Sequence, residues 1–275
     1  MRGAWSKARL AAIVVAGLGS FLPGPGGAAE APAARKPIRA MLVTGGPYHN
    51  YRAQQKILVE GMATRANIEW TVAFEEKNDT GYKIPLFDKP GWADGFDVVV
   101  HNECYADVDD PAYVAKVVAV HKAGVPAVVV HCAMHTFRGM KSDEWREFLG
   151  VTTVRHGAQH PLTVTNDRPE HPIMKGFPAS WTTGNEELYQ IDKLWPDSVA
   201  LASATETNKK VYPVLWTHQY GKGRVFGTTL PHNQGTLADP VFLDVFARGL
   251  LWAAGRLDDS GQPDAGAAPV APAAK

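Results

Sequence analysis

Hydrophobic residues in the first half of the chain fall into short continuous runs, and stretches with helical spacing separate these runs. Continuous apolar runs of about four to eight residues are typical of parallel strands that are buried on both faces. Alternation of such strands with helices predicts a doubly wound α/β sheet that carries helices on both faces. The predicted strands cover 38–44, 68–74, 97–100 and 127–130, and the predicted helices cover 51–66 and 110–123.

The pattern changes past residue 150, where strand candidates follow one another without long helices between them. The runs 212–217 and 224–230 flank the segment QYGKG at 219–223 and therefore predict a β-hairpin. An amphipathic helix over 240–254 closes the domain. Further strand candidates lie at 161–165 and 198–202.

Both ends of the chain differ from the middle in composition. Residues 1–29 combine basic side chains, a thirteen-residue apolar stretch and small residues before Ala29, which predicts a cleaved secretory signal peptide. We therefore expect a periplasmic or secreted protein that keeps no stable membrane span. Residues 30–37 are interpreted as a linker, 38–256 as the folded domain, and the Ala/Pro/Gly-rich segment 257–275 as a disordered tail.

The overall composition is that of a globular protein of neutral charge. The chain has 28 basic and 28 acidic residues among 275, and no segment concentrates positive charge. This balance disfavours nucleic acid as a partner, because binding to phosphate backbones relies on clustered positive charge. The turn Gly45-Gly46-Pro47 does not match the G-x-G-x-x-G pattern of dinucleotide-binding proteins. The sequence leaves the oligomeric state open.

Histidines gather at the positions that directly follow predicted strands. In parallel sheets, ligands bind beyond the carboxyl ends of the strands, so these side chains are expected to face one crevice. Imidazoles that converge in this way suit a divalent ion such as Zn or Mn, or general acid/base chemistry near neutral pH. The histidines are His49, His101, His131, His135 and His232, and Glu103 follows the same strand as His101. Of these, His49, His131 and His232 are the candidate metal ligands.

His131 and His135 are four residues apart, which would place both on one face of a helix that begins there. The spacing lacks the glutamate of the H-E-x-x-H motif, so it is weak evidence for a metal site. We interpret His131 as catalytic and His135 as a substrate-binding residue.

Several motifs together resemble the ThuA-like (trehalose utilisation) family, part of the class I glutamine amidotransferase-like superfamily. They are LVTGGPYHNY from Leu42, VVHCAMHTF from Val129, HPLTVTNDRPEHPIMKGFP from His160, NEELYQID from Asn185 and WTHQYGKGRVFGTTLPHN from Trp216. The resemblance covers residues 39–255 and implies a flavodoxin-like three-layer αβα sandwich. It also implies a role in sugar metabolism, notably of disaccharides oxidised at C3.

The resemblance implies a pocket built from His49, His131, His160, Glu187 and His232. On this basis we expect His131, Glu187 and His232 to be catalytic, and His49, His160 and Tyr189 to bind substrate. Glu187 and Tyr189 occur in 181–191, a stretch without regular period that we interpret as a loop crossing the site.

Cys132 stands where class I glutamine amidotransferases carry their nucleophile. Those relatives use G-x-C-x-G at this turn, whereas Val130 and Met134 occupy the glycine positions here, and His232-Asn233-Gln234 lacks their late carboxylate. Cysteine hydrolysis is therefore a minor alternative. In an exported protein Cys104 and Cys132 could instead form a disulfide, but a half-buried free thiol is our expectation.

The sequence leaves three candidate functions for this protein. The first is a hydrolase, lyase or isomerase that acts on a small carbohydrate, for example a 3-keto-glycoside or a disaccharide, through a His/Glu site with or without a metal. The second is a noncatalytic carbohydrate-binding or envelope scaffold protein. The third is the Cys132-dependent hydrolase of amidotransferase type.

Overall fold

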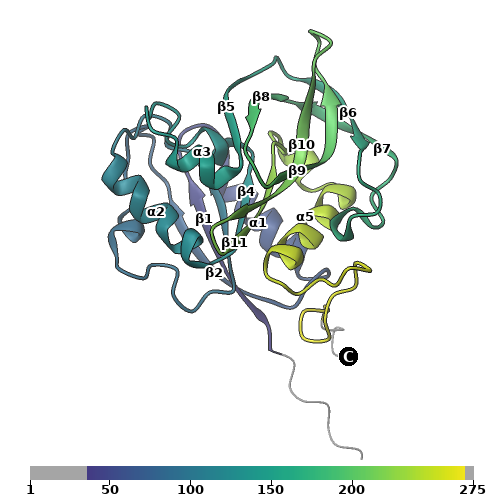
Figure 1. Cartoon of the computed structure of the whole chain (residues 1–275), viewed down its shortest axis with the longest axis horizontal. Helices are drawn as coiled ribbons and strands as arrows, with labels where there is room; N and C mark the ends of the chain where they lie inside the picture. Colours follow the sequence, from purple (N-terminus) through teal and green to yellow (C-terminus); the bar gives the residue numbers. More distant parts are fainter. Residues whose placement is uncertain (1–35, 270–275) are drawn as a thin grey trace, which may run out of the picture. The chain divides into compact units, whose positions relative to one another are not determined.

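A nine-stranded sheet forms the centre of the part of the chain that the computed structural model describes, residues 36–269 (Figure 1). Its strand order is β2-β1-β3-β4-β11-β10-β9-β6-β7, and β5 pairs with β8 in a separate two-stranded sheet. The strands are β1 (Ile38–Gly45), β2 (Ile68–Glu75), β3 (Val98–Glu103), β4 (Ala127–Val130), β5 (Val151–His156), β6 (His160–Asn166), β7 (Ser180–Glu186), β8 (Tyr189–Leu194), β9 (Ser198–Thr205), β10 (Val211–Tyr220) and β11 (Gly223–Thr228).

The first five strands in this order, β2 to β11, run parallel to one another. Every residue of β3 and β4 is buried, as expected for parallel strands that are covered on both faces. Leu42 in the centre of β1 pairs with Val72 on one side and Val100 on the other. The apolar runs of β1, β3 and β4 are therefore inner strands of this sheet. The run at 68–74 forms β2, an edge strand without a buried residue, so the expectation that it is covered on both faces is wrong.

Helices cover both faces of the sheet and complete three layers. Helices α1 (Tyr51–Met62) and α5 (Pro240–Ala253) contact each other on one face, whereas α2 (Pro111–Ala123) and α3 (Glu144–Leu149) contact each other on the other face (Figure 1). The side chains of Asn50, Asp110 and Asp239 cap the N-termini of α1, α2 and α5. The predicted flavodoxin-like α/β sandwich is confirmed.

The second half of the sheet is antiparallel. Strands β10 and β11 form the predicted hairpin, and β9, β6 and β7 extend the sheet from β10. The prediction of a loop over 181–191 is wrong, because this stretch contains the end of β7 and the start of β8 with Glu187 between them. In β7 mainly alternate residues, including Trp181 and Thr183, are buried. Exposed polar residues stand between them, so the strand has no continuous apolar run.

His101 and Glu103 do not reach the crevice at the strand ends. Strand β3 continues to Glu103, so both residues lie within it and, two positions apart, share one face. Their side chains are buried, with His101 Nδ1 2.7 Å from Glu103 Oε1 and His101 Nε2 3.0 Å from His121 Nε2 of α2. They form a polar network under the α2–α3 layer.

Residues 257–269 pack against the domain, so the expectation of a disordered tail is wrong for this segment. Asp264 pairs with Arg256 and accepts the backbone N–H groups of Gly266 and Ala267. The carbonyl of Ala267 accepts a hydrogen bond of 3.0 Å from the N–H of Asn67, and Ala267 is fully buried. The predicted signal peptide lies outside the described residues. No helix between residues 36 and 269 is long and apolar enough to cross a membrane.

Candidate functional site

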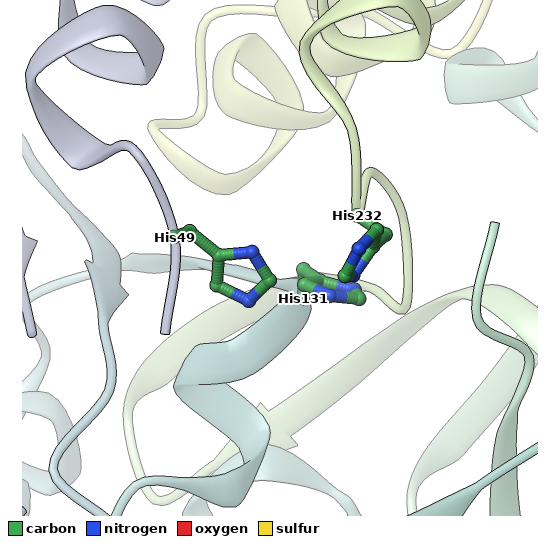
Figure 2. A group of neighbouring side chains, drawn as sticks. All are labelled: His49, His131 and His232. Atoms are coloured by element: carbon green, nitrogen blue, oxygen red, sulfur yellow. The ribbon is translucent and has the colours of Figure 1, made fainter. Parts of the chain in front are cut away.

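Three histidines from three different loops converge beyond the carboxyl ends of the parallel strands. His49 follows β1, His131 follows β4 and His232 follows β11. One ring nitrogen of each lies within 4.8 Å of the others (Figure 2). The sequence predicted this convergence from the positions of the residues after buried strands.

Two glycines shape the loop that carries His49. Gly45 and Gly46 have φ values of +142° and +126°, which residues with a side chain rarely adopt. A Cβ atom at Gly45 would lie 2.1 Å from the carbonyl oxygen of Glu75, and one at Gly46 would lie 2.5 Å from that of Cys104. The absence of side chains at these positions lets the loop pass between the ends of β2 and β3 and bring His49 to the site.

His131 occupies the sharp turn that follows β4. Its φ of 46° is in the left-handed region, a strained conformation of the kind that clusters at functional sites. Nδ1 donates a hydrogen bond of 2.6 Å to the carbonyl oxygen of Thr229, so the tautomer leaves a lone pair on Nε2. That Nε2 atom is buried and has no hydrogen-bond partner. An oriented imidazole with a free lone pair is what a metal site requires.

Burial keeps two of the three rings neutral. Burial, together with the neighbouring His232, lowers the pKa of His49 to about 4. Burial and the neighbouring His49 hold the pKa of His131 well below its usual value. Neutral imidazole is the form that binds metal ions.

His232 is oriented by two polar neighbours. Its Nδ1 lies 3.2 Å from Glu187 Oε2, and this contact raises the pKa of His232. Its Nε2 lies 2.9 Å from the side-chain nitrogen of Gln159. Gln159 is a site residue that the sequence analysis missed.

Glu187 is the carboxylate of the site. Its Oε2 lies 3.5 Å from Nε2 of His156 and 3.7 Å from Nε2 of His131, in addition to the contact with His232. Burial by itself would raise the pKa of Glu187, but the contacts with His232, His156 and Gln159 outweigh burial and lower the pKa. The carboxylate is therefore ionised at neutral pH and positioned beside the three imidazoles.

Glu186 holds the loop that carries His232. Its carboxylate accepts the backbone N–H of His232 at 2.5 Å, the backbone N–H of Asn233 at 3.3 Å and the side-chain N–H of Asn233 at 2.8 Å. Glu186 is fully buried. The sequence does not predict this role, because only the fold brings the end of β7 next to the loop that carries His232.

His49 and His232 line a pocket of about 270 Å³ that also contains Glu187 and Tyr189, and the buried His131 contacts this lining. The ring of Tyr189 stacks on His135 with centroids 4.1 Å apart and an interplanar angle of 10°. The same ring lies 4.7 Å from the ring of His131. His135 and Tyr189 thus line the pocket, as expected, and form an aromatic wall beside the metal-ligand candidates.

Two predicted placements are wrong. His131 and His135 belong to a 3-10 helix, in which residues four apart do not share a face, so His135 contacts Thr153 and Tyr189 and stands apart from the three histidines. His160 lies outside the pocket: its Nδ1 donates to the carbonyl of Ala158 at 2.8 Å. Its Nε2 lies 3.8 Å from Glu206, and the preceding residue, Gln159, faces the site instead.

Cys104 and Cys132 form a disulfide, so the expectation of a free thiol is wrong. Their Cα atoms are 5.4 Å apart because the two cysteines follow adjacent parallel strands, β3 and β4. A disulfide sulfur is not a nucleophilic thiolate, so the structure does not support the Cys132-dependent hydrolase. The strained position after β4 belongs to His131, not to Cys132.

The donor set fits a divalent transition metal. Three imidazole nitrogens beside a carboxylate match the nitrogen and oxygen ligands that zinc and similar ions take in catalytic sites. The backbone carbonyl that orients His131 provides the outer contact that such a ligand needs.

Comparisons with known proteins place the chain in a family. The family model described as "ThuA: Trehalose utilisation" matches residues 39–253. A ThuA-like protein from Parabacteroides merdae has a similar structure, with a TM-score of 0.64, 19% identity, and coverage of 80% of this chain and 90% of that one. A ThuA-like protein from Bacteroides uniformis gives a TM-score of 0.61 and 17% identity, with coverage of 86% and 98%.

A β-galactosidase from Bacillus circulans shares the fold more distantly. Its TM-score is 0.51 at 14% identity, and the match covers 82% of this chain but 33% of that enzyme. None of the curated proteins matches the chain. The family model spans almost the whole described domain, and the chain therefore belongs to the ThuA, or trehalose utilisation, family.

Proposed function

We propose that this protein is an enzyme of carbohydrate metabolism in which His49, His131 and His232 hold a divalent metal ion such as Zn or Mn. The observation that carries the proposal is the buried, unpartnered Nε2 of His131, which lies among two further imidazoles and one carboxylate. A buried lone pair without a partner is costly unless a ligand occupies the site in the working protein. An ion bound there would polarise a substrate carbonyl or activate a water molecule.

Proton transfer is assigned to Glu187. Its carboxylate is ionised, partly exposed to the pocket and fixed by His156 and Gln159. A carboxylate held in this way can remove a proton from the carbon next to a ketone or from a water molecule. Either step would suit a 3-keto-glycoside, on which a lyase, isomerase or hydrolase acts by such a proton transfer.

The pocket supports a small carbohydrate as substrate. A volume of about 270 Å³ lies at the lower end of ordinary ligand sites, so it suits one sugar ring rather than a long chain. Tyr48, which lines the pocket and is 45% exposed, offers an aromatic ring to a ligand, whereas the ring of Tyr189 is buried against His135. Aromatic rings of this kind pack against the apolar faces of ligands while their hydroxyl groups remain available for hydrogen bonds.

Export is part of the proposal. The charged and apolar start of the chain supports it, and so does the Cys104–Cys132 disulfide, because disulfides persist in oxidising compartments such as the periplasm. N-terminal sequencing of the native protein should give a start near residue 30. A native protein that begins at Met1 would contradict export.

The test of function combines metal analysis with product detection. The purified protein is incubated, with and without EDTA, with oxidised and unoxidised disaccharides, and products are identified by mass spectrometry. We expect stoichiometric metal, turnover that EDTA abolishes, and loss of turnover in H131N and E187Q. His160→Asn is the matched control, because His160 lies outside the pocket. Sugar binding without turnover of any substrate would instead favour the noncatalytic carbohydrate-binding protein.

A further inference from the structure

Arg138 differs from the other arginines of the described chain in having no partner for its guanidinium. Among residues 36–269, seven arginines form ion pairs with carboxylates, Arg224 lies over the ring of Trp252, and Arg248 donates to backbone carbonyls. Arg138 makes none of these contacts, and it lines the pocket that contains His49, Glu187 and His232. An unpaired cation at a pocket wall is available to a ligand.

The backbone around Arg138 is fixed. The N–H of Arg138 donates to the carbonyl of His135, and its carbonyl accepts from the guanidinium of Arg146, both at 3.2 Å. On either side, Phe137 donates to the carbonyl of Tyr105 and Gly139 to that of Ala106. Phe137 is buried although its φ is 57°. Hydrogen bonds therefore hold the turn at both ends, and the backbone of Arg138 is fixed at the pocket.

No acidic group of the pocket neutralises this charge. Glu187 is the carboxylate that lines the pocket, and three histidines and Gln159 already surround it. Burial, with the charge of Arg138, lowers the pKa of His135 to about 3, so this ring of the pocket wall is neutral near pH 7. A divalent ion at the three histidines would add further positive charge to the same space.

We infer that the substrate carries an anionic group, a carboxylate or a phosphate, which the Arg138 guanidinium binds while the sugar ring faces Glu187 and the three histidines. This inference rests on the proposed function, because it names the class of carbohydrate that the same site accepts. Arginine is suited to this contact because its planar group can donate two parallel hydrogen bonds to a carboxylate or a phosphate. A neutral sugar would leave this exposed charge to solvent alone.

The test compares binding of four probes to the intact mature protein by calorimetry at constant ionic strength. The probes are glucose, glucuronate, glucose 6-phosphate and inorganic phosphate. We expect one of the two anionic sugars to bind at least about tenfold more tightly than glucose, as is typical of a hydrogen bond to a charged group. Which of the two is preferred identifies the anion as carboxylate or phosphate.

Variants assign the preference to Arg138. R138Q should abolish the preference for the anionic sugar, and R138K should retain part of it. Lys141→Gln removes an exposed charge from the same connecting segment without changing the pocket lining, so it should leave the preference unchanged. Equal binding of anionic and neutral sugars, or an unchanged preference in R138Q, would overturn the inference. So would inorganic phosphate that binds as tightly as glucose 6-phosphate, because that result indicates a simple anion site.

The same titrations after EDTA treatment separate this inference from the proposed function. If the protein binds no metal and turns over no substrate but still prefers an anionic sugar through Arg138, the proposed function is contradicted and the inference of an anionic ligand is supported. If the protein is a metal-dependent enzyme that binds glucose and both anionic sugars equally, the inference is contradicted and the proposed function is supported.

Discussion

His232 Nδ1 lies 3.2 Å from Glu187 Oε2, although the two residues follow strands from opposite halves of the sheet. His232 follows β11 of the parallel half, and Glu187 follows β7 at the far antiparallel edge. The return of the chain from β7 toward β8 brings the carboxylate over the ends of the parallel strands. The site therefore depends on both halves of the domain.

Removal of the His131 imidazole should weaken metal binding. In H131N the ring nitrogen that faces His49 and His232 is lost, so we expect the zinc affinity to fall by about two orders of magnitude or more, beyond what loss of an outer contact costs. Competition with a chelating dye measures the affinity. The H160N control should bind zinc as the unmodified protein does, and an H131N protein with unchanged affinity would exclude His131 as a ligand.

Glu186 is expected to act by positioning His232. E186Q keeps an acceptor for the backbone N–H of His232 but replaces a carboxylate that serves three donors. We expect turnover to fall about 10- to 100-fold with little change in KM, because the outer contacts of a metal ligand are typically worth that factor. Steady-state kinetics and the Tm are measured together. A variant that loses Tm but retains turnover below its Tm would show a structural role alone.

Acid should destabilise the fold through buried histidines. Burial, together with His101, lowers the pKa of His121 to about 3 in the fold, whereas the unfolded side chain titrates near 6.5. Between these values the unfolded chain binds a proton that the fold does not, so the free energy of unfolding decreases as pH falls from about 6.5 toward 3. Above about 6.5 this contribution is complete and constant. The slope has an upper limit of about 1.4 kcal/mol per pH unit for one histidine.

Urea unfolding at pH 7.5, 6.0 and 5.0 checks this expectation. H121Q should reduce the slope between pH 6.0 and 5.0, even if it also lowers stability at pH 7.5. Equal slopes for the variant and the unmodified protein would show that His121 already carries a proton in the fold.

The parallel half of the fold could be predicted because its inner strands are buried on both faces. The runs 98–100 and 127–130 are apolar at every position, as expected for strands that are covered on both faces. β7 could not be recognised in this way, because its exposed positions are polar and its alternation is interrupted near Glu186. The prediction that His101 follows its strand was wrong for a related reason. A strand can continue past its apolar run when a buried polar ring finds a hydrogen-bond partner, as His101 does in His121.

The candidate site was predictable where topology alone gathers residues. His49, His131 and His232 follow parallel strands, so their convergence needs no knowledge of side-chain contacts. Arg138 and Gln159 could not be found, because their place depends on irregular segments whose course is set by tertiary hydrogen bonds. The resemblance gave Glu187 correctly as a residue of the pocket but gave His160 in place of its neighbour.

The disulfide should stabilise both the fold and the position of His131. Cys132 directly follows His131, and its bond to Cys104 joins the ends of β3 and β4 across a sequence separation of 28 residues. Closing a loop of that length restricts the unfolded chain, which corresponds to about 3–4 kcal/mol of stability in the chain-entropy model. Double substitution by alanine, C104A with C132A, should lower the free energy of urea unfolding by up to that amount. It should also weaken zinc binding, because the strained turn at His131 would lose one of its anchors.

A thiol assay on native protein purified without reductant should detect no free thiol before unfolding and none after it. Detection of two free thiols in the unfolded native protein would contradict the disulfide, and an unchanged zinc affinity in the double variant would show that Thr229 and the sheet position His131 without it.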